Sequence, residues 1–182
     1  ERGISGTGLK KIIGIEPNNK ALNFAKKNIP NVDFRNGDAF KTGLPNSSSD
    51  IVVLFDVIEH VPKHSENKVF DEVRRILKKG GVLLLSTPNN YFLNNLLDPA
   101  WYFGHRHYPV RDITKLIESS GFSIEWVDIR GKFWTLIYML WFYVNKWVFM
   151  GKLKSCSWLN NKDDKSFEEK GINTIYIVAR RL

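Results

Sequence analysis

The sequence predicts an α/β fold with a Rossmann-like, doubly wound and mostly parallel sheet. Apolar runs of strand length alternate along the chain with segments of helical periodicity. The clearest part runs from Asp50 to Asn90: an apolar run, an acidic loop, an amphipathic segment, two glycines and a second apolar run. This order is typical of a βαβ unit, in which loops at the carboxyl ends of the strands bind ligands. The pattern therefore favours an enzyme.

The size and composition favour one domain over residues 1–182. The chain has 182 residues, of which 43% are hydrophobic and 25% charged, and this is enough for one sizeable core. A single cysteine, Cys156, excludes an internal disulfide framework, and no signal peptide pattern is found. We therefore expect a cytoplasmic protein.

Local patterns predict the first elements. Residues 11–16 are a β-branched run and predict a strand, after which Asn18 suits the start of a helix. Ser65 can cap a helix whose apolar residues repeat at helical spacing, and Gly80 with Gly81 is expected to end it.

The rest of the chain continues the alternation. Asp112 is expected to cap a helix that Gly121 stops, and residues 89–110 resemble a lid. Residues 133–150 predict an apolar helix and 151–171 a polar connection. The other strands are expected at 32–36, 51–55, 82–87, 122–129 and 172–179.

The positive charge lies near the carboxyl end. Residues 1–129 carry 17 Lys and Arg against 15 Asp and Glu, whereas residues 130–182 carry 10 against 4. Residues 133–150 are nearly all apolar and include eight aromatic side chains, and Asn145 and Lys146 interrupt the run. Such a helix can lie in a membrane interface or cover a lipid-like acceptor, or it can be buried in the core or a dimer contact. An anionic membrane surface at residues 130–154 is therefore a candidate partner, and nucleic acid is disfavoured.

Two acids follow successive strands. Glu16 stands where a nucleotide-binding acid stands, since one carboxylate can accept from both ribose hydroxyls, although the helix dipole also favours an acid there. Asp38 could accept from an adenine amino group, or it could simply shape a turn.

Several motifs resemble class I S-adenosylmethionine-dependent methyltransferases. They are IIGIEPNNKALNFAKKN, GDAF, SSSDIVVLFDVIEHV, RRILKKGGVLLLSTPN and the GF at 121–122, in that order. The resemblance implies S-adenosylmethionine as cofactor and a seven-stranded sheet with a reversed C-terminal hairpin. It places Glu16 on the ribose, Asp38 and Ala39 at the adenine, and Phe55 near the methionine. The implied function is methyl transfer to a small or lipid-linked acceptor by in-line displacement.

His60 is the first candidate for a catalytic base, because a histidine titrates near neutral pH, although it could equally orient its loop. Asp56, Glu59 and His60 resemble the metal-binding acidic motif of ubiquinone-biosynthesis O-methyltransferases, where a hard cation could activate a hydroxyl. Many relatives carry EHV without a metal, so no metal site is predicted.

Residues 105–108 resemble the HLHFF-type segment that lies over the substrate pocket in one branch of these enzymes. We therefore predict that His105, His107 and Tyr108 contact substrate, with hydrogen bonds to the loop backbone as the alternative.

The start of the sequence departs from the family. SGTG resembles the glycine-rich turn at the cofactor, but Gly8 lies only eight positions before Glu16, where about 20 are expected. Gly6 and Gly8 are therefore interpreted as loop residues, the first strand of the fold is expected to be lacking, and cofactor binding by these residues alone is expected to be poor. A non-catalytic remnant or binding module, and a nicotinamide-dependent Rossmann enzyme, are the alternatives.

Overall fold

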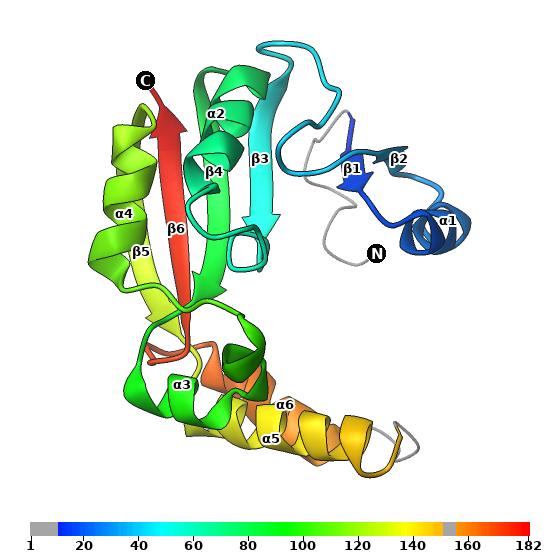
Figure 1. The fold of residues 1–182 in the computed structure, drawn as a ribbon, viewed down its shortest axis with the longest axis vertical. Helices are drawn as coiled ribbons and strands as arrows, with labels where there is room; N and C mark the ends of the chain where they lie inside the picture. Colours follow the sequence, from blue (N-terminus) through cyan, green and yellow to red (C-terminus); the bar gives the residue numbers. More distant parts are fainter. Residues whose placement is uncertain (1–10, 151–155) are drawn as a thin grey trace. The chain divides into compact units, whose positions relative to one another are not determined.

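The computed structural model describes residues 11–150 and 156–182, which form two compact units (Figure 1). The first unit ends at Pro45 and the second begins at Asn46. A single domain over the whole chain stays a prediction, and Gly6 and Gly8 lie outside the described residues.

The first unit is a small β-α-β arrangement. Its elements are β1 (Ile13–Glu16), α1 (Asn19–Asn28) and β2 (Asp33–Asn36). The two strands are parallel, with Glu16 opposite Asn36 at their carboxyl ends. Asn18 caps α1 as predicted, since its Oδ1 accepts from the main-chain N–H groups of Lys20 and Ala21.

The second unit contains a mixed four-stranded sheet in the order β3-β4-β6-β5. β3 and β4 are parallel, whereas β6 is antiparallel to both β4 and β5. The α/β fold with a reversed C-terminal hairpin is therefore confirmed. The elements are β3 (Ser49–Phe55), α2 (Glu66–Ile76), β4 (Leu77–Pro88), α3 (Phe92–Leu97), the 3-10 helix η1 (Pro99–Phe103), α4 (Val110–Ser119), β5 (Phe122–Arg130), α5 (Phe133–Trp147), α6 (Ser157–Ser166) and β6 (Thr174–Arg181).

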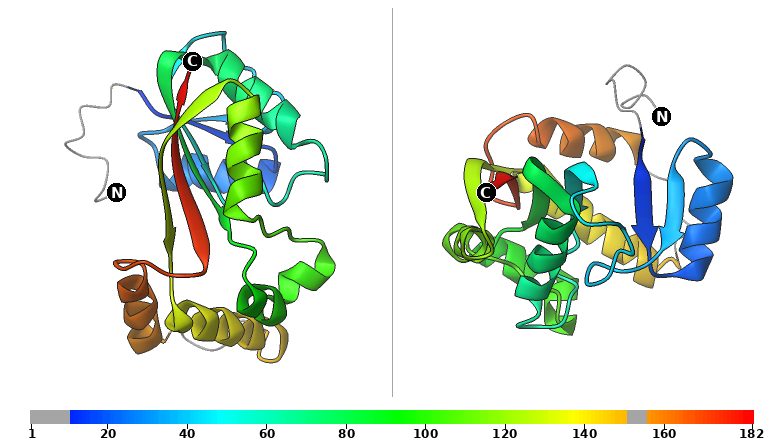
Figure 2. Two further views of the ribbon diagram at one scale, coloured as in Figure 1. Left: turned by 90° about the vertical axis from the view of Figure 1, so that its left-hand side faces the viewer. Right: turned by 90° about the horizontal axis from the view of Figure 1, so that it is seen from above.

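The core of this unit lies between the sheet and two helices, α2 and α4, on one of its faces (Figure 2). The apolar positions of α2 repeat every three or four residues, so Val69, Phe70 and Val73 share one face and are buried. Ile113 and Ile117 of α4 are buried in the same way. Full burial of each such side chain stabilises the fold by about 1.5–3 kcal/mol.

β3 is the open edge of the sheet. In the described part of the chain it pairs with β4 alone, and its alternate side chains Ile51, Val53 and Phe55 are about half exposed, at 47%, 50% and 51%. These three residues point to one face because strand side chains alternate. An apolar strip therefore runs along β3 to the carboxyl end of the strand.

Two predicted helix boundaries were wrong. The helix after Ser65 ends at Ile76 rather than at Gly80, because Leu77 already pairs with Ser49 of β3. Gly80 does adopt a left-handed φ of 73°, but inside β4, where the register with β3 shifts. Asp112 is not the cap of α4 but lies in its first turn, because Pro109 holds the N-cap position.

The predicted polar connection 151–171 contains a helix, α6. Its sequence is mostly polar, so no apolar periodicity marks it, yet Leu159 is buried and Trp158 packs edge-on against Trp134 of α5 at 5.4 Å between ring centroids. The helix forms because it packs on α5, a tertiary effect that can override weak local preference.

The predicted lid, residues 89–110, folds as α3 and η1. With α5 and α6, these elements lie beyond the carboxyl ends of β3 and β4 (Figure 1). In doubly wound folds this end of the sheet is where ligands bind.

Candidate functional site

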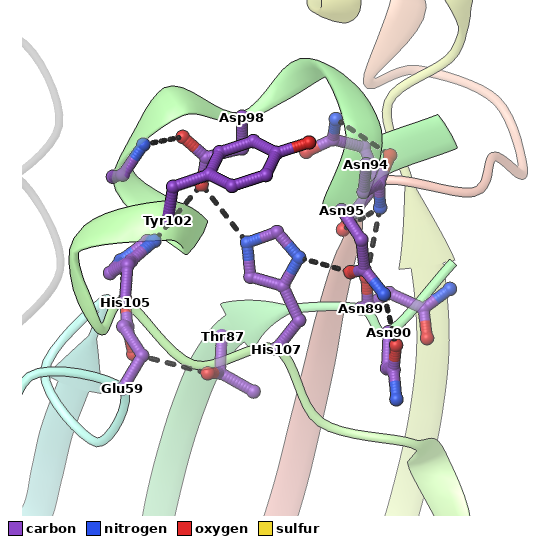
Figure 3. Close-up of polar contacts among 12 residues, drawn as sticks. Glu59, Thr87, Asn89, Asn90, Asn94, Asn95, Asp98, Tyr102, His105 and His107 are labelled. Atoms are coloured by element: carbon purple, nitrogen blue, oxygen red, sulfur yellow. Dashed lines mark hydrogen bonds and ion pairs between the residues drawn. The ribbon is translucent and has the colours of Figure 1, made fainter. Parts of the chain in front are cut away.

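A cavity of about 380 Å³ lies where the predicted lid and α5 meet the carboxyl ends of β3 and β4. All of its walls belong to the second unit. Its lining is rich in acids and histidines, which Figure 3 shows in part. The lining residues are Asp56, Glu59, His60, Pro88, Asn94, Asp98, Ala100, His105, His107, Met139, Tyr143, Asn173 and Thr174.

The loop after β3 begins with a left-handed residue. Asp56 has a φ of 52°, a conformation that an aspartate tolerates better than most residues. Its main-chain N–H donates to the carbonyl of Ser86, and the Ser86 hydroxyl donates to its Oδ1 at 3.0 Å. The chain thereby turns from the exposed edge strand and buries Ile58 and Glu59.

Glu59 is a buried acid with one unpaired oxygen. Its side chain is fully buried, and Oε2 accepts from the Thr87 hydroxyl at 3.1 Å (Figure 3). Oε1 has no hydrogen-bond partner among the described residues and lies 3.8 Å from Nε2 of His105. Burial raises the pKa of Glu59 to about 7.

Asp98 holds the two histidines of the lid. Its Oδ2 lies 3.0 Å from Nδ1 of His105 and 3.0 Å from Nε2 of His107, while Oδ1 accepts from the N–H of Ala100 (Figure 3). Burial would raise the pKa of Asp98, but the hydrogen bonds from the two imidazoles outweigh it and hold the pKa well below its usual range. The acid is therefore ionised at neutral pH.

The two lid histidines differ in whether a ring nitrogen remains available to a ligand. His107 is buried, and its Nδ1 lies 2.7 Å from Oδ1 of Asn95, so both ring nitrogens contact protein oxygens. His105 is partly exposed and keeps Nε2 toward Glu59 and the cavity. The hydrogen bond to Asp98 raises the pKa of His105 despite its burial.

His60 is exposed and lines the same cavity, with its ring 4.7 Å from that of His105. The described residues give its imidazole no hydrogen bond. Partial burial, followed by the nearby His105, lowers the pKa of His60.

Tyr108 is buried, and its hydroxyl is engaged by neighbouring residues. The hydroxyl lies 3.1 Å from Oε1 of Glu66 and accepts from Nε of Arg106 at 2.9 Å. Burial raises the pKa of Tyr108 to about 12. Tyr108 lines a second cavity of about 670 Å³, which shares His60, His105 and His107 with the first.

The predicted cofactor residues of the first unit lie at the carboxyl ends of its strands. Oε1 of Glu16 accepts from the N–H of Asn18 at 2.8 Å, and Oε2 has no hydrogen bond to a described residue. Asp38 shapes a turn, because its Oδ1 accepts from the N–H groups of Phe40 and Lys41, both at 2.8 Å, and Ala39 lies inside that turn. Glu16 therefore keeps an oxygen that suits a ribose hydroxyl.

Phe55, the other predicted cofactor residue, ends β3 in the second unit. Its ring is half exposed and meets the edge of Tyr176 at 6.5 Å between centroids. An exposed aromatic surface at the end of a parallel strand suits a ligand with an apolar part.

Two groups of side chains bring possible metal-ligating atoms within 4.8 Å of one another: Glu59 with His60 and His105, and Asp98 with His105 and His107. In the second group the atoms already hydrogen-bond to each other. Asp56, which the D-x-x-E-H pattern would supply, is in neither group.

The sequence prediction missed Asp98, Asn94 and Arg106. Asp98 precedes a proline, a pattern typical of a helix cap, and it does cap η1. The Asn94 amide donates to the carbonyl oxygens of Asn89, Ile172 and Asn173, which ties the lid to the start of β6. No local sequence pattern predicts such contacts between residues far apart in the chain.

Comparison with known proteins identifies sequence relatives. A family model described as a methyltransferase domain matches residues 3–85. A probable S-adenosylmethionine-dependent methyltransferase of Mycolicibacterium smegmatis is 34% identical over 125 residues, 68% of this chain and 47% of that protein. The ubiquinone/menaquinone biosynthesis C-methyltransferase UbiE of Campylobacter jejuni is 36% identical over 74 residues, 41% of this chain and 31% of that protein. The chain thus spans less than half the length of these curated relatives.

A solved structure shares the fold. The crystal structure of a SAM-dependent methyltransferase from Methanosarcina mazei superposes with a TM-score of 0.65 at 16% identity, over 94% of this chain and 82% of that one. At this identity the likeness shows the fold alone. The sequence relatives and the shared fold together show that the chain belongs to the class I S-adenosylmethionine-dependent methyltransferases.

Proposed function

We propose that the protein transfers a methyl group from S-adenosylmethionine to a small molecule bound in the 380 Å³ cavity of the second unit. The observation that carries the proposal is the position of this cavity, at the carboxyl ends of β3 and β4 and under the predicted lid. Its lining combines the DVIEHVP loop with the lid histidines, so ionisable groups and an enclosed space occur together.

The cofactor residues remain those predicted from the sequence. Glu16 would bind the ribose through its open oxygen, Asp38 and Ala39 would lie at the adenine, and Phe55 at the methionine part. When bound, S-adenosylmethionine supplies an electrophilic methyl group on a positively charged sulfur. The protein's own residues have to hold the acceptor in line with that group, exclude water and take up a proton.

On the acceptor side, His60 and His105 offer imidazoles to the cavity, and one of them would take the proton. His107 would contribute mainly by holding the lid, because both of its nitrogens are engaged. Tyr108 would touch an acceptor only through its ring, from the second cavity, because its hydroxyl is bound to Glu66 and Arg106.

Calorimetry tests the cofactor and separates the alternatives. The protein is titrated with S-adenosylmethionine, S-adenosylhomocysteine and NAD. In line with the prediction from the sequence, we expect the first two to bind weakly, and we expect at least a further tenfold loss of affinity in Glu16→Gln. Asp33→Asn is the matched control, because Asp33 lies at the opposite end of the same small sheet and pairs with Arg35. Selective NAD binding would support the nicotinamide enzyme instead, and cofactor binding without any methylated product would support the non-catalytic alternative.

A lipid-linked acceptor at an anionic membrane surface is the second candidate. The observation that favours it is the exposed apolar surface of α5, where Phe142, Val144 and Trp147 are 46%, 46% and 54% exposed and Lys146 lies next to the ring of Phe142. The same helix supplies Met139 and Tyr143 to the cavity. An aromatic face with basic neighbours suits a membrane interface. In the described residues, no helix combines the length and hydropathy that crossing a bilayer requires.

A further inference from the structure

We propose that His105 is the general base of this methyl transfer, that Asp98 is its positioning residue, and that the acceptor is a molecule with an ionisable hydroxyl or amine. The inference rests on the proposed function and names the substrate class of the same cavity. Asp98, His105 and Glu59 lie in a row across the wall between the lid and the loop after β3 (Figure 3).

The hydrogen bond to Asp98 decides which ring nitrogen of His105 is basic. An ionised carboxylate can only accept, so the Nδ1 atom that lies 3.0 Å from Oδ2 must carry the hydrogen. In the neutral ring the lone pair is then on Nε2. His105 lines both cavities, and Nε2 faces away from Asp98, toward Glu59 and the cavity. This is the geometry of an imidazole oriented by a carboxylate to accept a proton.

Glu59 lies on the side of His105 away from Asp98, with its Oε1 3.8 Å from Nε2. A buried carboxylate oxygen without a hydrogen bond is unfavourable, and in the ionised Glu59 that predominates at pH 8, Oε1 is such an atom among the described residues. A proton that arrives on Nε2 turns His105 into a cation with a carboxylate on each side, 3.0 Å and 3.8 Å away. The unpaired oxygen then gains an ion-pair partner. Proton transfer to His105 therefore reduces the unfavourable free energy of the buried, unpaired Glu59 oxygen. The raised pKa of His105 agrees with this.

Other titratable groups also face His105. They are Asp56 and His60 from the loop after β3 and His107 from the lid, and Tyr143 of α5 lines the same cavity. The carboxylate of Asp56 adds to the attraction for a proton, and a charge on His60 would oppose it. The Arg106 side chain is directed to the carbonyl oxygens of Ile58 and Val61. The electrostatic potential at Nε2 is therefore set mainly by the nearby carboxylates, which favour a proton there.

His60 suits the role of base less well. The residue is exposed, its imidazole has no hydrogen bond to a described residue, and partial burial, followed by the neighbouring His105, lowers its pKa. A base with a lowered pKa and no fixed orientation accepts a proton from a hydroxyl less readily. His60 remains a candidate for contact with the acceptor.

In the transfer step, X is the oxygen or nitrogen atom of the acceptor hydroxyl or amine. The X–H bond breaks, its electron pair stays on X, and the proton moves to Nε2 of His105. The pair on X forms the new bond to the methyl carbon, and the former methyl–sulfur pair stays on sulfur. Acceptors that are already ionised, such as carboxylates, need no base. An oriented base therefore indicates a hydroxyl or amine acceptor.

Two phenols test the proposal by activity. Phenol keeps its proton at pH 8, whereas 4-nitrophenol is largely ionised. His105→Asn retains a donor toward Asp98 but removes the basic nitrogen. We expect the rate of transfer to phenol to fall roughly 100-fold or more, and the rate for 4-nitrophenol to fall far less. His64→Asn is the matched control, because His64 lines neither cavity and has a φ of 67°, which asparagine tolerates.

The outcomes separate this proposal from the proposed function. Equal losses with both phenols, or no loss in His105→Asn, would overturn the role of His105 as base. A wild-type protein that binds S-adenosylmethionine but methylates neither phenol would overturn the substrate class. Failure to bind S-adenosylmethionine would instead overturn the proposed function.

Nuclear magnetic resonance of labelled histidine tests the positioning residue without any acceptor. We expect His105 to show a raised pKa, which falls in Asp98→Asn and in Glu59→Gln, and protonation of the neutral ring at Nδ1. A pKa that neither substitution moves, or a neutral ring protonated at Nε2, would overturn the role given to Asp98. Thermal melts confirm that each variant is folded.

Discussion

The guanidinium of Arg106 donates to the main-chain carbonyl of Ile58 at 2.7 Å, and so joins the lid to the loop that carries Glu59 and His60. The same side chain also donates to the carbonyl of Val61 and to the hydroxyl of Tyr108. The position of the acid and histidine walls of the cavity relative to each other therefore depends on one largely buried arginine.

Arg106→Met should lower the free energy of unfolding by about 2–4 kcal/mol, because it leaves buried carbonyl oxygens without their charged donor. Chemical unfolding in urea measures the change. Arg111→Met, at an exposed position of α4, should change it by less than about 0.5 kcal/mol. Equal effects of the two substitutions would show that the hydrogen bonds of Arg106 between the lid and the loop after β3 do not stabilise the fold.

Phe70→Ala should destabilise the second unit by about 3–5 kcal/mol, since the ring is fully buried and its removal leaves a cavity. Phe92→Ala removes an identical side chain that is 73% exposed on α3, and it should cost little. Thermal or urea unfolding of the pair measures the difference. Similar losses in both variants would show that the core is not organised around α2.

The sequence predicted the architecture well because its strongest signals are local. The apolar runs of β3 and β4, with the helical periodicity of α2 between them, identify the βαβ unit without any tertiary information. The reversed hairpin was expected from the family resemblance, and the pairing of β5 with β6 confirms it.

The elements that failed depend on contacts between distant residues. α6 has little amphipathic character and is stabilised against α5, and α2 ends early because Leu77 pairs with Ser49. Asp98 was missed for the same reason: its two histidine contacts form only once η1 has bent the chain back on itself. The roles of Glu16, Asp38, Ala39 and Phe55 stay predictions that binding experiments test.

Glu59→Gln should change how stability depends on pH. Burial raises the pKa of Glu59 from an ordinary 4.5 to about 7, so between these values the folded state binds the proton more tightly than the unfolded state. The resulting stabilisation is present below about pH 4.5 and is lost as the pH rises through 7. We expect Glu59 to lower the free energy of unfolding of the wild type by up to about 3 kcal/mol as the pH rises through this range. Glu59→Gln should not show this loss.

Urea unfolding of wild type and Glu59→Gln at pH 5 and pH 8 measures that difference. The variant should gain relative to the wild type at pH 8, since its amide oxygen can still accept from Thr87. Glu118→Gln on the exposed side of α4 should show no such gain. The raised pKa of His105 acts in the same direction in the wild type, so only the comparison between variants isolates Glu59. A difference that does not depend on pH would contradict the raised pKa.

The exposed apolar surface of α5 should bind anionic vesicles. Phe142 and Trp147 are exposed on this helix, with Lys146 next to Phe142, and insertion of either ring would remove apolar surface from water. In a sedimentation assay with vesicles rich in phosphatidylserine, Phe142→Ser with Trp147→Ser should weaken binding roughly tenfold or more. Phe24→Ser with Trp126→Ser is the matched control, because it removes an exposed phenylalanine and an exposed tryptophan from α1 and β5. Equal binding by the two double variants would mean that α5 does not meet a membrane, and its exposed face would then need a protein partner.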